Sequence, residues 1–272
     1  MVACAAAGWG TWSLFLFPTR LPAQATMPII FFVMGVASLP FIRRDDAPVW
    51  DRDVWWLLAA NTIFDAANCV CFFSAYDHTT VAIAVITHYA APIVIALVAP
   101  MIDGTTAPGT RPAAAIALGG LVILLEPWQS PSAGALVGAA LGFASALFYA
   151  GNVFVTRRLA ARIGAGRAMA YHSLLAAAIT APLGIAWYGR VTFGSLALLA
   201  GGAITIGSGA GILFVVGLGR IGSARAAVLT FVEPLVAVAV GALVWDQTLH
   251  SIAALGGALV LAAGVYVGQK AR

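Results

Sequence analysis

Long runs of apolar residues, separated by short polar loops, dominate this sequence. A helix needs about 20 mostly apolar residues to cross a membrane, within a range of about 17 to 25. The first and fifth runs are short. The pattern predicts an all-helical (all-α) membrane protein with ten transmembrane helices, at approximately residues 2–18, 26–42, 54–76, 80–102, 112–127, 133–156, 168–188, 193–218, 222–245 and 250–268.

The composition supports a membrane environment. Apolar residues make up 62% of the chain and charged residues only 9%, whereas a soluble domain carries about 25% charged residues. Lipid must therefore replace water over most of the surface. The first apolar run has no preceding basic segment, so we interpret it as a retained span and not as a cleaved signal peptide. We expect a multi-pass protein of the inner or plasma membrane.

The distribution of basic residues predicts the orientation, because Lys and Arg accumulate in short cytoplasmic loops. With ten spans, one side of the membrane carries only Arg20 and Arg190. A missed span would mix the two sets, so the separation supports the count and places both termini in the cytoplasm. The other 12 of the 14 basic residues share the second side: Arg43, Arg44, Arg52, Arg111, Arg157, Arg158, Arg162, Arg167, Arg220, Arg225, Lys270 and Arg272.

The chain contains an internal repeat. The segment TTVAIAVITHYAAPIVIAL (79–97) aligns with IGSARAAVLTFVEPLVAVA (221–239), which places Tyr89 on Phe231. Further along, LGGLVILL (118–125) aligns with LGGALVLA (255–262). The similarity between the two starts of the repeat is weaker. The sequence therefore predicts two copies of a repeat of five helices.

The predicted repeats occupy residues 1–127, with spans one to five, and residues 133–272, with spans six to ten. Five is an odd number, so the second repeat must enter the membrane from the opposite side to the first. Inverted repeats of this kind are typical of transporters, because two inversely related halves can open a central site alternately to each side. The fused repeat already supplies both halves of a pseudo-symmetric unit, which favours a monomer.

The segment FVEPLVAVAVGALVWDQTLHSIAALGGALVLAAGVYV (231–267) resembles the closing part of the EamA repeat of the drug/metabolite transporter superfamily. In that repeat a Glu-Pro pair precedes an apolar run, an acidic turn and a final helix of small residues. The first half carries a degenerate version in which Ala91 stands where the second has Glu233. The resemblance implies a secondary-active exporter of small organic metabolites such as amino acids, working by alternating access at a cavity between the repeats.

Two stripes of polar side chains lie within predicted spans. Asn61, Asp65 and Asn68 share one face of the third span. Ser145, Tyr149, Asn152 and Thr156 share one face of the sixth. Ionisable residues in membranes usually face a cavity or a partner. We expect a substrate-lining role, with interhelical hydrogen bonding as the alternative.

Other polar residues accompany the two prolines of the repeat. Glu233 precedes Pro234 and lies near Thr230, and His88 with Tyr89 occupies the equivalent place before Pro92. Glu233 and His88 are candidate sites for a coupling proton, although Glu233 could instead pair locally. The expected substrate-binding residues are Asn61, Asp65, Asn68, His88, Tyr89, Tyr149, Asn152, Thr230 and Glu233.

Further candidates lie on the wall or at the mouth of the pathway. Trp9, Trp12 and Ser13 occur in the first span, and Tyr171 and His172 in the seventh. Aromatic side chains also anchor helices at the membrane interface, which is the alternative role for these residues.

The sequence contains none of the common motifs for metal or nucleotide binding or for a nucleophilic serine. We therefore expect no cofactor, no metal and no enzymatic activity. The expected partners are a small-molecule substrate, the lipid bilayer and protons. The net charge of +4 comes without a basic, aromatic-rich patch, so nucleic acid is excluded. Two alternatives remain: an intramembrane enzyme in which Asp65, His88 and Glu233 converge, and a lipid flippase-like carrier with a lateral opening.

Overall fold

The computed structural model describes residues 1–42, 48–104, 107–129, 134–246 and 251–269. Over this part of the chain the regular elements are helices and no strand occurs. The expected all-helical fold class is therefore confirmed. Four basic residues used to predict the orientation, Arg43, Arg44, Lys270 and Arg272, lie outside the described residues, as does residue 133, the expected start of the second repeat.

In the ranges that the structure describes, the first half of the chain, up to Gln129, and the second half, from Gly134, each contain seven α-helices. Those of the first half are α1 (Val2–Trp9), α2 (Ser13–Leu16), α3 (Ala23–Ser38), α4 (Arg52–Tyr76), α5 (Val81–His88), α6 (Ala91–Ile102) and α7 (Thr110–Leu125). Those of the second half are α8 (Ala135–Ile163), α9 (Ala165–Thr180), α10 (Phe193–Gly202), α11 (Ala210–Ile221), α12 (Ser223–Leu229), α13 (Val232–Val244) and α14 (Ser251–Gln269).

Tighter and wider helical turns extend several of these elements. A π-helical segment, η6 (Ala203–Gly209), joins α10 to α11 in one continuous helix. The 3-10 turns are η1 (Phe17–Thr19), η2 (Leu39–Phe41), η3 (Pro127–Gln129), η4 (Ala181–Gly184) and η5 (Tyr188–Arg190).

Among the described residues, seven helical segments are long and apolar enough to cross a membrane. They are Ala23–Phe41, Arg52–Tyr76, Val81–Ile102, Ala135–Ile163, Phe193–Ile221, Ser223–Val244 and Ser251–Gln269, and each overlaps an expected span. These segments make the chain a multi-pass membrane protein.

The other three expected spans are helical but shorter or interrupted. A turn at residues 10–12 divides the first span into α1 and α2. The fifth corresponds to α7, whose 16 residues extend about 24 Å against about 30 Å of hydrocarbon. The seventh corresponds to α9, which ends at Thr180, where the 3-10 turn η4 with Pro182 follows. The count of ten spans stays a prediction.

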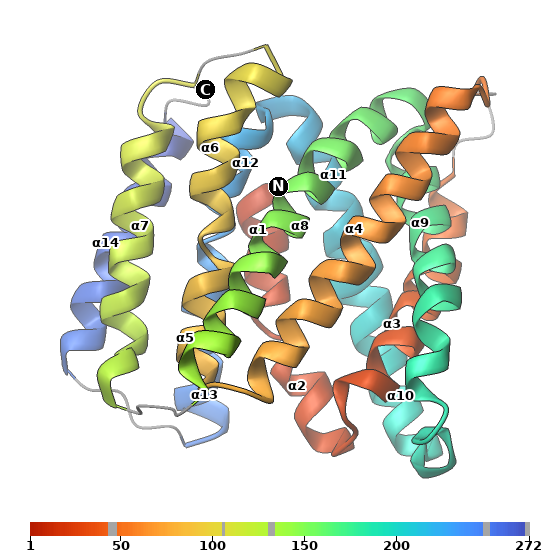
Figure 1. Ribbon diagram of the computed structural model, residues 1–272, viewed down its shortest axis with the longest axis horizontal. Helices are drawn as coiled ribbons and strands as arrows, with labels where there is room; N and C mark the ends of the chain where they lie inside the picture. Colours follow the sequence, from red (N-terminus) through yellow and green to blue (C-terminus); the bar gives the residue numbers. More distant parts are fainter. Residues whose placement is uncertain (43–47, 105–106, 130–133, 247–250, 270–272) are drawn as a thin grey trace.

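Helices far apart in the sequence lie side by side. Figure 1 shows α7 with α14 at one edge of the bundle and α3 with α9 at the other. A third extensive contact joins α4 to α8. Each of these pairs takes one helix from the first half of the chain and one from the second. The two halves therefore interlock and do not form separate lobes.

Two of the long segments are broken near their middle. The break between α5 and α6 falls at Tyr89, and the break between α12 and α13 falls at Thr230 and Phe231. Pro92 and Pro234 follow within a turn, and each removes a backbone donor from the helical ladder. Both breaks therefore have a local cause in the sequence, and both lie at aligned positions of the predicted repeats.

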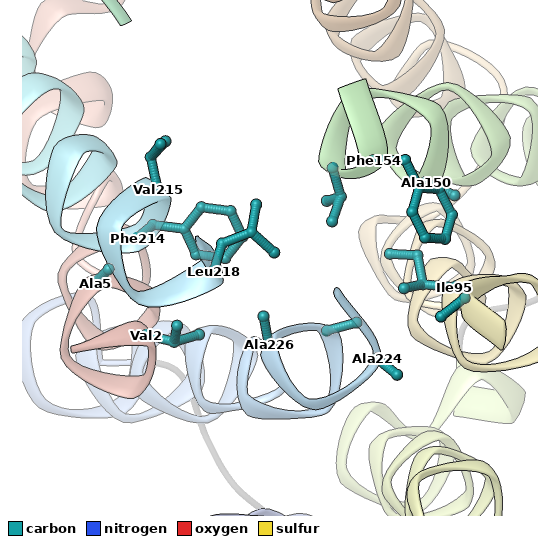
Figure 2. Close-up of a cluster of buried hydrophobic side chains, with 13 residues drawn as sticks. Val2, Ala5, Ile95, Ala150, Phe154, Phe214, Val215, Leu218, Ala224 and Ala226 are labelled. Atoms are coloured by element: carbon teal, nitrogen blue, oxygen red, sulfur yellow. The ribbon is translucent and has the colours of Figure 1, made fainter. Parts of the chain in front are cut away.

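Small and medium apolar side chains fill the space between several of the helices. In Figure 2, Phe214 and Leu218 of α11 approach from one side, and Phe154 of α8 and Ile95 of α6 approach from the other. Ala224 and Ala226 of α12 lie beside them, and Val2 and Ala5 of α1 complete the cluster. Such small side chains let helix backbones approach closely.

Candidate functional site

A chain of polar side chains connects α4 to α8 inside the bundle. The Asn152 amide donates to Oδ1 of Asp65 over 3.1 Å. The Thr156 hydroxyl lies 2.6 Å from Oδ1 of Asn61 and 3.0 Å from Oδ1 of Asn152, and its single proton serves one of them at a time. The two stripes that the sequence predicted therefore face each other.

His172 on α9 joins this network. Its Nε2 lies 3.1 Å from Oδ2 of Asp65, and its Nδ1 lies 2.7 Å from the carbonyl oxygen of Ala168. Asp65 thus contacts two helices of the second half of the chain. The sequence suggested His172 only for the wall of the pathway, and no pattern in it connected this residue to Asp65.

The network leaves two amide atoms without a partner. Asn68 is buried farther along α4, and its Oδ1 has no hydrogen-bond partner within the described ranges. The same holds for Nδ2 of Asn61. Asn68 is therefore the member of the α4 stripe that the structure leaves outside the network, and its Oδ1 is available to accept a hydrogen bond.

A second polar group surrounds His88. Its Nδ1 lies 2.7 Å from Oγ of Ser145. Because the Ser145 hydroxyl donates to the carbonyl oxygen of Gly142, its oxygen can accept the Nδ1 proton of His88. Aromatic rings enclose the imidazole, with centroid distances of 4.5 Å to Phe72 and 5.4 Å to both Tyr89 and Tyr149.

Glu233 lies next to this aromatic group. Its carboxyl interacts electrostatically with Tyr89, Tyr76 and Tyr149. Within the described residues no basic side chain forms an ion pair with Glu233. A charged Glu233 therefore needs water or a bound ligand to balance it.

Tyr149 connects the two groups. Its side chain interacts electrostatically with both Asp65 and Glu233, and it adjoins Thr230. Thr230 itself donates to the carbonyl oxygen of Ala227 over 2.7 Å. The expected residues thus form two neighbouring polar groups that share Tyr149.

The three acidic and basic residues considered for an enzyme do not bond to one another. Asp65 bonds to Asn152 and His172, His88 bonds to Ser145, and Glu233 interacts electrostatically with Tyr89. The described residues also contain no cluster of three metal-ligating side chains. The arrangement offers carboxyl, amide, hydroxyl and aromatic contacts for a small polar molecule.

Trp9, Ser13 and Tyr171, expected on the pathway wall, make contacts with residues distant in the sequence. The indole N–H of Trp9 donates to the carbonyl oxygen of Ile206 over 3.0 Å, within the π-helical segment η6. The indole N–H of Trp245 donates to Oγ of Ser13 over 3.1 Å. Tyr171 packs against the ring of Trp50, with centroids 5.6 Å apart.

Ion pairs gather at the end of α8 that carries the arginines. Arg157 pairs with Asp103 over 3.0 Å, and the other carboxylate oxygen of Asp103 accepts the backbone N–H of Ser223. Arg162 pairs with Asp51, the residue that caps the start of α4. The backbone N–H of Val54, together with the Arg162 guanidinium, lowers the pKa of Asp51.

A cavity of about 530 Å³ opens beside these ion pairs. It lies between α8 and α11, and its lining includes Arg157, Arg158, Val215 and Gly219. The cavity is therefore apolar on the side of α11 and basic on the side of α8.

Three similarities relate the chain to known proteins. Residues 136–268 match the EamA-like transporter family. A protein of Archaeoglobus fulgidus named as an uncharacterized transporter is 27% identical over 265 residues, which cover 96% of this chain and 92% of that protein. A crystal structure of another protein shares the fold, with a TM-score of 0.84 at 19% identity over 100% of this chain and 97% of that one. The family match over the second half of the chain and the relative named as a transporter support an EamA-type transporter of the drug/metabolite transporter superfamily.

Proposed function

We propose that this protein is a secondary-active exporter of small organic metabolites such as amino acids. One observation carries the proposal: polar side chains from both halves of the chain converge inside an otherwise apolar bundle. Asp65 of α4 bonds to Asn152 of α8, and Glu233 of α13 interacts with Tyr89 next to α5. Polar groups at this depth are costly in lipid and usually serve a pathway.

We further propose ten spans arranged as two inverted repeats, residues 1–127 and 133–272. The pattern of helix contacts supports this arrangement. Exchanging the two repeats converts the contact of α4 with α8 into that of α11 with α1, and it converts the contacts of α3 with α9 and of α7 with α14 into themselves. A set of contacts that survives this exchange is expected of a pseudo-two-fold axis.

The proposed substrate site comprises the two groups around Tyr149. Asp65 and Glu233 supply carboxyls, Asn61, Asn68 and Asn152 supply amides, and His88, Tyr89, Tyr149 and Thr230 supply ring and hydroxyl contacts. An amino acid offers an ammonium group and a carboxylate, which match these donors and acceptors. Movement of one repeat against the other would open this site alternately to the two sides of the membrane.

The direction follows from the proposed orientation. Arg157 and Arg158 belong to the basic side, which we place in the cytoplasm with both chain termini. The cavity between α8 and α11 adjoins these residues and would admit substrate from that side. Both repeats lie in one chain, so we propose that the monomer contains the whole pathway.

Counterflow in proteoliposomes tests the proposal. Vesicles loaded with an unlabelled amino-acid mixture should take up the same mixture in radiolabelled form faster than protein-free vesicles. Glu233→Gln should lower this rate about tenfold or more, since a hydrogen bond to a charged group contributes about 1.5–3 kcal/mol. Asp77→Asn, at the exposed end of α4, is the matched control and should leave the rate unchanged.

Folded protein without any counterflow would contradict amino acids as the substrate class. Transfer of a fluorescent phospholipid between leaflets by the same vesicles would favour the flippase-like alternative, because a lipid carrier needs a lateral opening to the bilayer.

A further inference from the structure

The two ring nitrogens of His172 both face oxygen atoms that accept hydrogen bonds. Nδ1 lies 2.7 Å from the carbonyl oxygen of Ala168, and Nε2 lies 3.1 Å from Oδ2 of Asp65. A carbonyl oxygen cannot donate, so Nδ1 must carry a hydrogen. The contact at Nε2 then needs a second proton, because without it two lone pairs would face each other.

This geometry fixes the charge of the pair. With the second proton present, His172 and Asp65 are neutral together, either as imidazolium and carboxylate or as imidazole and carboxylic acid. The Asn152 amide donates to the other oxygen, Oδ1, of Asp65 and favours the carboxylate form. The proton therefore resides on Nε2 of His172, and its loss leaves one uncompensated negative charge among α4, α8 and α9.

We propose that Asp65 and His172 together form the proton-binding site that couples transport to the proton gradient. This inference rests on the proposed transport function and assigns the coupling to this pair in place of His88 and Glu233. In each cycle the pair binds one proton on Nε2 of His172 and releases the same proton, and no other bond forms or breaks.

Among the described residues, no other charge balances Asp65. The titratable side chains that interact with it are Cys69 on α4 and Tyr149 on α8, besides His172 on α9. Helix α3, which packs on α9, has no titratable residue. Helix α5, which contacts α4, contributes only His88, which bonds to Ser145.

Other charged groups on the elements around α9 are engaged elsewhere. Arg167 on α9 donates to the carbonyl oxygen of Ile163, and Tyr171 packs on Trp50. Arg220 at the end of α11 contacts the sulfur of Met1. Glu233 reaches the pair only through Tyr149, with which it also interacts. The proton on His172 is therefore the charge that compensates Asp65.

The location of the pair suits a coupling role. Asp65 belongs to the first half of the chain and His172 to the second, so movement between the halves changes their separation. The Asp65 side chain is 16% exposed and that of His172 is 7% exposed, so the carboxyl is the more accessible end. Separating the two groups leaves each charge unpaired in apolar surroundings, which drives the proton off the imidazole.

The protonation state can be measured without a substrate. The full-length protein is labelled with ¹⁵N-histidine and placed in lipid nanodiscs, and the His172 resonances are assigned by their loss in His172→Gln. At neutral pH both ring nitrogens of His172 should carry a proton. In Asp65→Asn only Nδ1 should do so. A single ring proton on His172 in the unmodified protein would overturn the proposal.

Transport supplies the second measurement, with the radiolabelled amino-acid mixture as the probe. One proton per cycle and a gradient of one pH unit give about a tenfold accumulation, since one unit equals 1.36 kcal/mol. His172→Gln, at a residue outside the proposed substrate site, should reduce accumulation to the level without a gradient while counterflow at equal pH continues. The control Asp77→Asn should accumulate normally.

A double variant separates loss of proton coupling from loss of folding. Asp65→Asn with His172→Gln retains a neutral hydrogen-bonding pair between α4 and α9, so it should fold but not respond to the gradient. Gradient-driven accumulation by this variant would overturn the inference and leave the proposed function intact. Absence of counterflow in the unmodified protein would instead contradict the proposed function, and the nanodisc measurement would still decide the proton site.

Discussion

The rings of Tyr89 and Phe231, which occupy aligned positions in the two predicted repeats, lie against each other with their centroids 5.5 Å apart. Each residue sits where a long helical segment is broken, between α5 and α6 or between α12 and α13. A two-fold axis exchanges equivalent residues, so equivalent residues that touch must lie close to it. This contact therefore marks the proposed axis, beside Glu233.

Phe231→Ala should destabilise the protein strongly. The Phe231 side chain is 1% exposed, and truncating a buried Phe typically costs about 3–5 kcal/mol. Thermal unfolding in detergent should show a large decrease in melting temperature. Phe193→Ala is the matched control, because Phe193 is 88% exposed. Equal melting temperatures for the two variants would contradict the buried contact.

Gly256→Ala should separate α7 from α14. A Cβ at Gly256 would overlap the backbone of Leu124 and the carbonyl oxygen of Gly120. Forced overpacking costs about 1–3 kcal/mol. Gly264→Ala on the same helix meets no atom within 4 Å and should be neutral or stabilising, because Ala favours helix over Gly by about 1 kcal/mol. The two melting temperatures should therefore differ, and similar values would argue against close packing at Gly256.

The ion pair between Asp103 and Arg157 should show energetic coupling. The Asp103 side chain is 2% exposed, and removing one partner of a buried pair leaves an unbalanced charge. We expect Asp103→Asn and Arg157→Gln to be non-additive by about 0.5–3 kcal/mol in a double-mutant cycle. Unfolding of the two single variants and the double variant measures this value. Simple additivity would mean that the pair does not bind α6 to α8.

Asp51 should make stability depend on acid pH. Its pKa is lowered from 3.8 by the backbone N–H of Val54 and by Arg162. A lowered pKa stabilises the folded protein above pH 3.8 and loses this contribution as the pH falls through the folded value. Asp51→Asn removes the charge, so its melting temperature should approach that of the unmodified protein as the pH falls. A constant difference at every pH would contradict this role.

Helical periodicity predicted the α4 and α8 residues of the Asp65 network, but not the contribution of α9. Spacing alone placed Asn61 and Asp65 on one face of α4, and Asn152 and Thr156 on one face of α8, and the structure brings the two faces together. The breaks beside Pro92 and Pro234 also have a local cause, because each proline removes a backbone donor from the helix. These features follow from local sequence, so they can be predicted from it.

Contacts between distant helices could not be predicted in this way. His172 lies 107 residues from Asp65, and helical spacing relates only residues on the same helix. The division of the first expected span depends on tertiary packing as well, since Gly10 lies directly against the backbone of α13 at Glu233. The π-helical turn that receives the Trp9 indole likewise has no signature in the apolar run.

The interlocking of the two halves bears on how the chain is made. Asp65 enters the bilayer with α4, before the ribosome has synthesised Asn152 and His172. During that interval the carboxyl faces lipid or the insertion machinery alone, at a cost of about 2.5–3.5 kcal/mol for a charged group at the centre of a helix. Helix α4, 25 residues long and largely apolar, must offset this cost by itself. Asp65, which later joins the two halves, is therefore the residue that adds most to the free-energy cost of inserting the first half.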